Sequence, residues 1–180
     1  LDDAIRREKV RRIGASSMWT YQFIESFRVA ERHGLATFDT MQNHYNVVYR
    51  EEEREMLPFC DRENIGVLPW SPLAKGYLAR PHEEYMTTTR AETTESATYH
   101  PYAENGGQEI NERVEELAAE HGVTMAQIAI AWLLEKETVT APVVGTSSVE
   151  HLDQAVEALE ISLTDSDVEY LEEPYGPVPV

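Results

Sequence analysis

Hydroxyl, amide and aromatic side chains follow four short apolar runs of this 180-residue sequence. The four sets are Gly14-Ala15-Ser16-Ser17, Gln42-Asn43-His44-Tyr45, Trp70 to Gly76, and Gly145 to Ser148. Hydroxyls and free N–H groups at the start of a helix suit a phosphate anion. The same serines and threonines could instead only cap helices, which is their commonest structural use. The residues alone leave a phosphate site and a set of helix caps as equal alternatives.

The apolar runs predict four short strands, over residues 12–15, 36–42, 65–70 and 139–145. Helical patterns separate and follow them, over residues 21–33, 51–64, 108–121, 124–136, 149–159 and 164–173. Pro58 should bend the second of these helices. Strands that alternate with helices predict an α/β fold with a parallel sheet. Short strands with one helix each favour a (β/α)8 barrel of the TIM type, and about four βα units amount to half of one.

The segment 81–107 interrupts this alternation. It is rich in threonine, glutamate and tyrosine and shows no apolar period. A segment of this length is too long for an ordinary connection, so it predicts a functional loop, a lid or a disordered insertion.

The net charge of −18 belongs to the second part of the chain. Residues 1–80 contain 12 acidic and 12 basic side chains, whereas residues 81–180 contain 21 acidic and three basic ones. Because phosphates repel such a surface, we do not expect nucleic acid as a partner. The acidity fits a salt-adapted, halophilic surface and fits an ordinary acidic cytoplasmic protein equally well.

Cysteine content and hydropathy point to the cytoplasm. Cys60 is the single cysteine, which excludes an internal disulfide and suits a reducing compartment. The longest apolar stretch, residues 126–134, is far shorter than the ~20 residues that cross a membrane, so no membrane association is expected. The chain opens with Leu1 inside a helical pattern and without a signal peptide, which we interpret as a truncated start.

Longer runs of the sequence resemble the aldo-keto reductase superfamily. They are IGASSMW, MQNHYNVVYREEEREMLPFCDRENIGVLPWSPLAKGYL, APVVGTSSVEHLDQAVEAL and the ending LEEPY. The combination of Q-N-x-Y, W-S-P-L and G-T-S-S is specific, and it is most similar to the branch of aryl-alcohol dehydrogenases and potassium-channel β subunits. The resemblance covers residues 1–180 as the C-terminal part of such a barrel and is weakest over 81–107. It implies an oxidoreductase that reduces aldehydes or ketones with NADP(H) or NAD(H).

The resemblance also implies which residues bind the nicotinamide and the pyrophosphate. Ser16, Ser17 and Gln42 would reach the carboxamide, and Trp70 would stack on the nicotinamide ring. The pyrophosphate would be wrapped by Ser71, Pro72, Leu73, Lys75 and Gly76, with a similar part for Arg80. Without the resemblance, Trp70 would be a core aromatic and Lys75 a solvated cation.

The adenosine end of the cofactor falls on the last set of polar residues. Gly145, Thr146 and Ser147 would hold the 2′-phosphate or the ribose, and His151 and Gln154 match positions that contact adenine and phosphate. Two departures stand here: Gln154-Ala155 replaces a frequent Glu-Asn, and Ser147 stands where the family often has arginine. The loss of a cation weakens the case for a 2′-phosphate, so NADP preference over NAD is open.

The resemblance places the family's Asp, Tyr, Lys and His tetrad before the part matched by Leu1. We therefore expect no catalytic residue in this chain and no activity from the chain alone, whereas the intact enzyme would act on a small carbonyl substrate. His44 and Tyr45 are interpreted as pocket or structural residues, and the other histidines show no paired metal spacing. The alternative is a non-catalytic nucleotide-binding or regulatory half-barrel that pairs with a second copy or with a missing N-terminal half.

Overall fold

Three parallel strands are paired in sequence order in the computed structural model of the chain. They are β1 (Gly14–Ser16), β2 (Thr40–Gln42) and β3 (Gly66–Val67). The register places Ala15 opposite Met41 and Met41 opposite Val67. The structure describes residues 1–88, 102–146 and 148–177.

The segment 139–143 continues the parallel order beyond β3. Val139 forms a parallel bridge with Val67 and Val143 forms one with Trp70, and the Val143 N–H donates to the Pro69 carbonyl at 2.7 Å. Pro142 lacks an N–H, so the ladder is interrupted between the two bridges. All four predicted strand segments are therefore neighbours, although the last one forms isolated bridges in place of a regular strand.

Two helices connect the strands of the first half. After α1 (Asp2–Arg6) and β1, α2 (Thr20–His33) runs until Gly34, whose φ of 60° ends it in the left-handed conformation. The predicted helix over 51–64 is divided into a 3-10 turn, η1 (Glu51–Arg54), and α3 (Met56–Arg62). The break follows from Pro58, which cannot donate to the Arg54 carbonyl and whose ring would collide with it.

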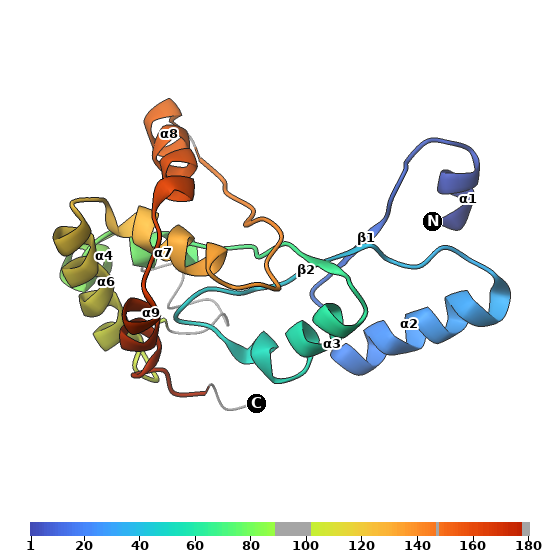
Figure 1. Cartoon of the computed structure of the whole chain (residues 1–180), viewed down its shortest axis with the longest axis horizontal. Coiled ribbons are helices and arrows are strands. Elements are labelled where there is room, and N and C mark those ends of the chain that lie inside the picture. The colour runs from blue at the N-terminus through green and yellow to red at the C-terminus, as the bar shows by residue number, and fades with distance from the viewer. Residues whose placement is uncertain (89–101, 147, 178–180) are drawn as a thin grey trace.

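The remaining helices gather at the end of the molecule away from α1 (Figure 1). They are η2 (Ala74–Ala79), α4 (His82–Met86), α6 (Gly107–His121), α7 (Met125–Leu134), α8 (Val149–Glu157), η3 (Ala158–Glu160) and α9 (Asp165–Glu172). The helix α7 is central, because it contacts α6, α8, η2 and η3. Its sequence is apolar nearly all round, and Ile128, Ala131, Trp132 and Leu133 are fully buried.

Both described ends of the segment 81–107 are ordered against this core. The five-residue helix α4 opens it and buries Tyr85, and Tyr102 is buried near its other end. The prediction of a functional loop, a lid or a disordered insertion did not foresee these ordered ends, because two isolated tyrosines give no helical or strand period. Residues 89–101 lie outside the described part of the chain.

No single helix in the described part of the chain is long and apolar enough to cross a membrane. The helices α6 and α7 meet the length and composition only as a pair, and they are bent by 98° at their junction.

Candidate functional site

The carboxyl ends of β1, β2 and β3 bring four of the predicted site residues together. Ser16 Oγ donates to the Gln42 carbonyl at 3.0 Å, and Trp70 Nε1 donates to Ser17 Oγ at 3.0 Å. The Ser17 N–H also donates to the Gln42 carbonyl, at 3.1 Å, and this bond supports Ser17 at a φ of 43°. The indole of Trp70 is therefore tied to the neighbouring strand end by Ser17, a second residue to which the family resemblance gives a contact with the nicotinamide.

His44 lies between two aromatic rings at the same strand ends. Its ring centroid is 4.1 Å from that of Tyr49 and 4.2 Å from that of Trp70, with interplanar angles of 13° and 11°. Two rings cannot share one face of an imidazole at these distances, so Tyr49 and Trp70 cover opposite faces. The expectation that His44 is a pocket or structural residue agrees with this position.

Asn46 joins the ring stack to the loop that follows β3. Its Oδ1 accepts from the Val48 N–H at 3.1 Å, and its Nδ2 donates to the Ser71 carbonyl at 2.9 Å. Ser71 has a φ of 54°, which is unusual for a residue other than glycine. Asn46 is fully buried and holds this turn in place. Sequence reasoning did not single it out, although its place two residues after His44 in the run QNHYN was an available signal.

Tyr102 reaches the same site from the far end of the segment 81–107. Its hydroxyl lies 2.9 Å from His44 Nε2. Burial raises the pKa of the Tyr102 phenol, and the neighbouring Tyr85 and Tyr49 add to the rise. The phenol is therefore a protonated hydrogen-bond donor and lacks the lowered pKa that an activated tyrosine acid would show. No pattern in the sequence pointed to it.

The loop predicted to wrap a pyrophosphate is tightly curled. Ser71, Ala74, Lys75 and Gly76 all have positive φ, between 47° and 96°. The Ala74 N–H donates to the Ser71 carbonyl at 2.9 Å, and the Gly76 N–H donates to the Leu73 carbonyl at 2.8 Å. Both of these N–H groups are used within the loop, and they hold it in its curled conformation.

The other predicted members of this loop differ in exposure. Pro72 is buried, Leu73 and Lys75 are half-buried, and Arg80 is exposed. Leu73 packs against the core, and the Arg80 carbonyl accepts from Asn111 Nδ2 at 3.0 Å.

The residues predicted for the adenosine end follow the neighbouring segment 139–143. Gly145 and Thr146 are exposed, and Thr146 Oγ donates to the Ser148 carbonyl at 3.0 Å. Ser148 Oγ accepts from the His151 N–H at 3.2 Å, so this serine is the N-cap of α8, as the capping interpretation predicted. The side chain of His151 is exposed and that of Gln154 is half-buried on the same helix, and Ser147 lies outside the described residues.

A half-buried carboxyl group lies behind the strand end of β2. Glu52 Oε2 accepts from Asn43 Nδ2 at 2.9 Å, and Asn43 is fully buried. Burial raises the pKa of Glu52 to about 7; the bond from Asn43 opposes the rise and the charge of Glu51 adds to it. Asn43 Oδ1 has no hydrogen-bond partner among the described residues.

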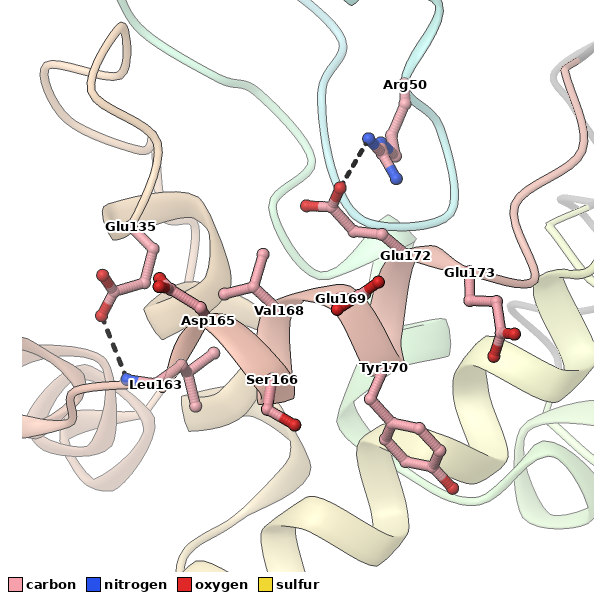
Figure 2. Close-up of a pocket in the computed structure, with 10 residues that line it drawn as sticks. All are labelled: Arg50, Glu135, Leu163, Asp165, Ser166, Val168, Glu169, Tyr170, Glu172 and Glu173. Carbon is pink, nitrogen blue, oxygen red and sulfur yellow. Dashed lines mark hydrogen bonds and ion pairs between the residues drawn. The ribbon is translucent and has the colours of Figure 1, made fainter.

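A cavity of about 780 Å³ lies elsewhere, along α9 (Figure 2). Its lining residues are Arg50, Glu135, Leu163, Asp165, Ser166, Val168, Glu169, Tyr170, Glu172 and Glu173. None of them belongs to the predicted cofactor set, and five are carboxylates, so the cavity does not suit an anionic cofactor. Within the ranges that the structure describes, no group of three or more histidine, cysteine, aspartate or glutamate side chains is placed to hold a metal ion.

The sequence matches the model of the aldo/keto reductase family over residues 1–175. It is 47% identical over 182 residues to a Schizosaccharomyces pombe protein assigned by name to the aryl-alcohol dehydrogenases, covering all of this chain and 50% of that protein. It is 41% identical to the versiconal hemiacetal acetate reductase of Aspergillus parasiticus, covering 98% of this chain and 52% of that enzyme. The chain thus spans about half the length of these relatives.

A solved structure shares the fold as well. A thermostable aldo-keto reductase crystallised with the inhibitor epalrestat superposes with a TM-score of 0.67 at 25% identity. The match covers 96% of this chain and 51% of that chain. The fold is therefore of the TIM-barrel type, and its α/β character and parallel strand order agree with the prediction from the sequence.

Proposed function

Because the chain belongs to the aldo/keto reductase family, we propose that it supplies the cofactor-binding, C-terminal half of an NAD(P)H-dependent carbonyl reductase. In this proposal β1, β2, β3 and the segment 139–143 are the last four strands of a (β/α)8 barrel. The observation that carries it is the meeting of Ser16, Ser17, Gln42 and Trp70 at the carboxyl ends of parallel strands, where such barrels bind their ligands.

The residues at the strand ends fit a nicotinamide. The hydroxyls of Ser16 and Ser17 and the amide of Gln42 can pair with a carboxamide, which fixes which face of the ring meets the substrate. Trp70 offers a flat ring, and since His44 covers one face, a nicotinamide would stack on the other. A bound nicotinamide supplies the hydride; these residues bind and orient it.

The loop Ser71–Gly76 and the start of α8 would hold the rest of the dinucleotide. The curled backbone and the ammonium group of Lys75 suit the pyrophosphate, and Thr146 with the start of α8 suits the adenosine end. NADP(H) is the first candidate by family, and NAD(H) is the second because a serine stands at position 147.

Calorimetric titration of the 180-residue chain with NADPH and with NADH tests cofactor binding. We expect a dissociation constant in the micromolar to millimolar range, weakened at least about tenfold by Trp70→Ala. Trp19→Ala is the control, because Trp19 is 61% exposed and lies outside the strand ends. No binding of either cofactor by the parent chain would contradict the proposal.

We further propose that the chain is inactive alone and that the first half of the barrel brings the catalytic tetrad and the carbonyl substrate. The names of the relatives make an aromatic aldehyde the first substrate to test. Mixing the chain with the separately produced first half of the Schizosaccharomyces pombe relative should restore NADPH oxidation. Reduction of the aldehyde by the 180-residue chain by itself would contradict the inactivity.

One observation favours the second candidate, a non-catalytic half-barrel that acts through association. The helix α8 has no buried residue and exposes Val149, Leu152 and Val156 on one side, and Leu159 of the following turn η3 is exposed as well. Such a face requires a partner, which is either a first half of the barrel or a second copy of this chain. Nucleic acid and membranes stay outside both proposals, and a cytoplasmic location remains our expectation from the single cysteine.

A further inference from the structure

We propose that His44 and Tyr102 are positioning residues that hold the Trp70 indole in the orientation a flat ring needs for stacking. The inference rests on the proposed function, because Trp70 is the residue assigned to the nicotinamide. It goes beyond that function because neither residue belongs to the predicted cofactor set. The proposal rests on two consecutive contacts: the hydrogen bond between Tyr102 and His44, and the stacking of His44 on Trp70.

The indole is held at two points. Its face lies on the His44 imidazole with an interplanar angle of 11°, and its Nε1 donates to Ser17 Oγ at 3.0 Å. The hydrogen bond alone would allow the ring to swing about the bonded edge. The His44 imidazole removes this freedom. The imidazole cannot move away from Trp70, because Tyr49 covers its opposite face. The plane of Trp70 is therefore set by the plane of His44.

The imidazole is in turn oriented through its Nε2. The amide of Asn46 is fixed by its own partners, since Oδ1 accepts from Val48 and Nδ2 donates to Ser71. Asn46 Nδ2 lies 3.4 Å from His44 Nε2, and it therefore directs an N–H hydrogen toward that nitrogen. Nε2 must then be the acceptor nitrogen of His44, and the Tyr102 hydroxyl, 2.9 Å away, is its donor.

Tyr102 is itself immobilised. It is 3% exposed, and its ring stacks with that of Tyr77 at a centroid distance of 6.2 Å and an angle of 17°. The Tyr77 hydroxyl lies 3.1 Å from His82 Nδ1 and donates to the Gly107 carbonyl at 3.4 Å. The start of α6 and the helix α4 thus brace the phenol that orients His44.

Tyr102→Phe isolates the hydroxyl, and Tyr85→Phe is its matched control. Tyr85 is a second buried tyrosine of the same cluster, but its hydroxyl has no hydrogen-bond partner among the described residues.

Labelling the three tryptophans with 5-fluorotryptophan gives fluorine resonances that Trp19→Phe and Trp70→Phe assign. Tyr102→Phe should shift or broaden the Trp70 resonance and leave unchanged that of Trp132, which is buried and, among the described residues, has no ring contact with His44 or Tyr102. Tyr85→Phe should change neither. An unchanged Trp70 resonance in Tyr102→Phe would overturn the proposal, because the resonance reports ring orientation without any cofactor.

Cofactor titration gives the second readout. Tyr102→Phe should weaken NADPH binding about three- to tenfold, the range expected for one hydrogen bond, and Tyr85→Phe should stay within about twofold of the parent. His44→Phe keeps a ring in the stack but loses Nε2, so it should weaken binding similarly, and adding Tyr102→Phe to it should cost nothing more. Fully additive losses would overturn the coupling. If the parent chain binds no NADPH, the proposed function fails, and the fluorine resonances still decide the role of His44 and Tyr102.

Discussion

Glu52 is the side chain whose environment departs furthest from that of an ordinary surface carboxylate. It is turned inward against the fully buried Asn43, and burial raises its pKa to about 7. The folded chain therefore binds a proton at this site between about pH 4.5 and 7 that the unfolded chain has already lost. Stability contributed by the protonated form is complete below about pH 4.5 and is lost as the pH rises through 7. The cost of the ionised form above pH 7 is up to about 3 kcal/mol.

Glu52→Gln should remove this cost, because glutamine has the same shape and cannot ionise. At pH 8 we expect the variant to be more stable than the parent by about 2 kcal/mol, and at pH 4.5 to be no more stable. The glutamine amide can also donate to Asn43 Oδ1, which has no partner among the described residues. Urea denaturation across this pH range measures the difference.

The exposed Glu55 in the same segment provides the control for Glu52. Glu55→Gln should follow the parent at every pH. A stability difference between Glu52→Gln and the parent that does not change with pH would contradict the buried ionisation.

At the level of elements, the central helix α7 depends on a defined N-terminus. Thr124 Oγ accepts from the Gln127 N–H, and Gln127 Oε1 accepts from the Thr124 N–H at 2.9 Å, which is a complete capping box. Thr124→Ala should lower the free energy of unfolding by about 1 kcal/mol. Thr124→Ser keeps the acceptor oxygen and should lose much less. Equal losses in thermal denaturation would show that the threonine methyl group, and not the cap, is what matters.

The sequence was a good guide to elements that carry their own periodicity. The pattern over α2 predicted 21–33 against the observed Thr20–His33, and α7 was recognised as buried because it is apolar nearly all round. The strand segments were found in the right order but too long, since regular pairing requires neighbours that a local pattern does not contain. The sequence predicted only a bend at Pro58. The structure instead divides the helix into η1 and α3, because the proline ring would collide with the Arg54 carbonyl.

The proximity of residues that directly follow strands was predictable, whereas their role in binding a cofactor stays a prediction. Ser16, Ser17, Gln42 and Trp70 meet as expected, because the ends of parallel strands meet at one edge of a sheet. Tyr102 could not have been found in this way. It is 58 residues from His44 in the sequence and approaches from a segment without any period, so only tertiary packing brings the two together.

For the molecule as a whole, Arg50 ties the first half of the chain to its last helix. Its guanidinium pairs with Glu53 and with Glu172, both at 2.8 Å, and the second pair is drawn in Figure 2. The Arg50 side chain is 14% exposed, so these pairs are poorly screened by water. Arg50→Met would remove one partner from each of two carboxylates, while Glu53 keeps the Tyr45 hydroxyl and Glu172 keeps Lys136. It should cost about 1–3 kcal/mol in chemical denaturation.

Arg12→Met is the matched control for Arg50. Arg12 also pairs with a carboxylate, Asp39, at 2.6 Å, but its side chain is 79% exposed. Removal of this pair should cost less than about 1 kcal/mol. Similar losses for the two variants would mean that burial does not distinguish the two ion pairs.

Two apolar surfaces at opposite ends of the strand order bear on the partner of this chain. One is the α8 face, formed by Val149, Leu152 and Val156 of α8 and by Leu159 of η3, which are 48–74% exposed. The other is the α2 groove, a hollow of about 960 Å³ beside β1 whose lining includes Ile13, Val29, Leu35 and Phe38. If the proposed barrel closes from the segment 139–143 round to β1, the strands and helices that close it would cover both surfaces.

Leu152→Glu combined with Val156→Glu tests whether the α8 face is an interface. Both side chains are already exposed, so the stability of the isolated chain should change by less than about 0.5 kcal/mol. Light scattering should show less self-association than in the parent, and reconstitution with the first half of a relative should be lost, because two charges would enter an apolar contact. Glu150→Gln is the control, because the exposed Glu150 lies at least about 100° round α8 from Val149, Leu152 and Val156, and it should leave both readouts unchanged. The opposite result would be a monomeric parent and a double variant that reconstitutes normally. It would show that this face needs no partner, and it would remove the main support for a half-barrel that acts through association.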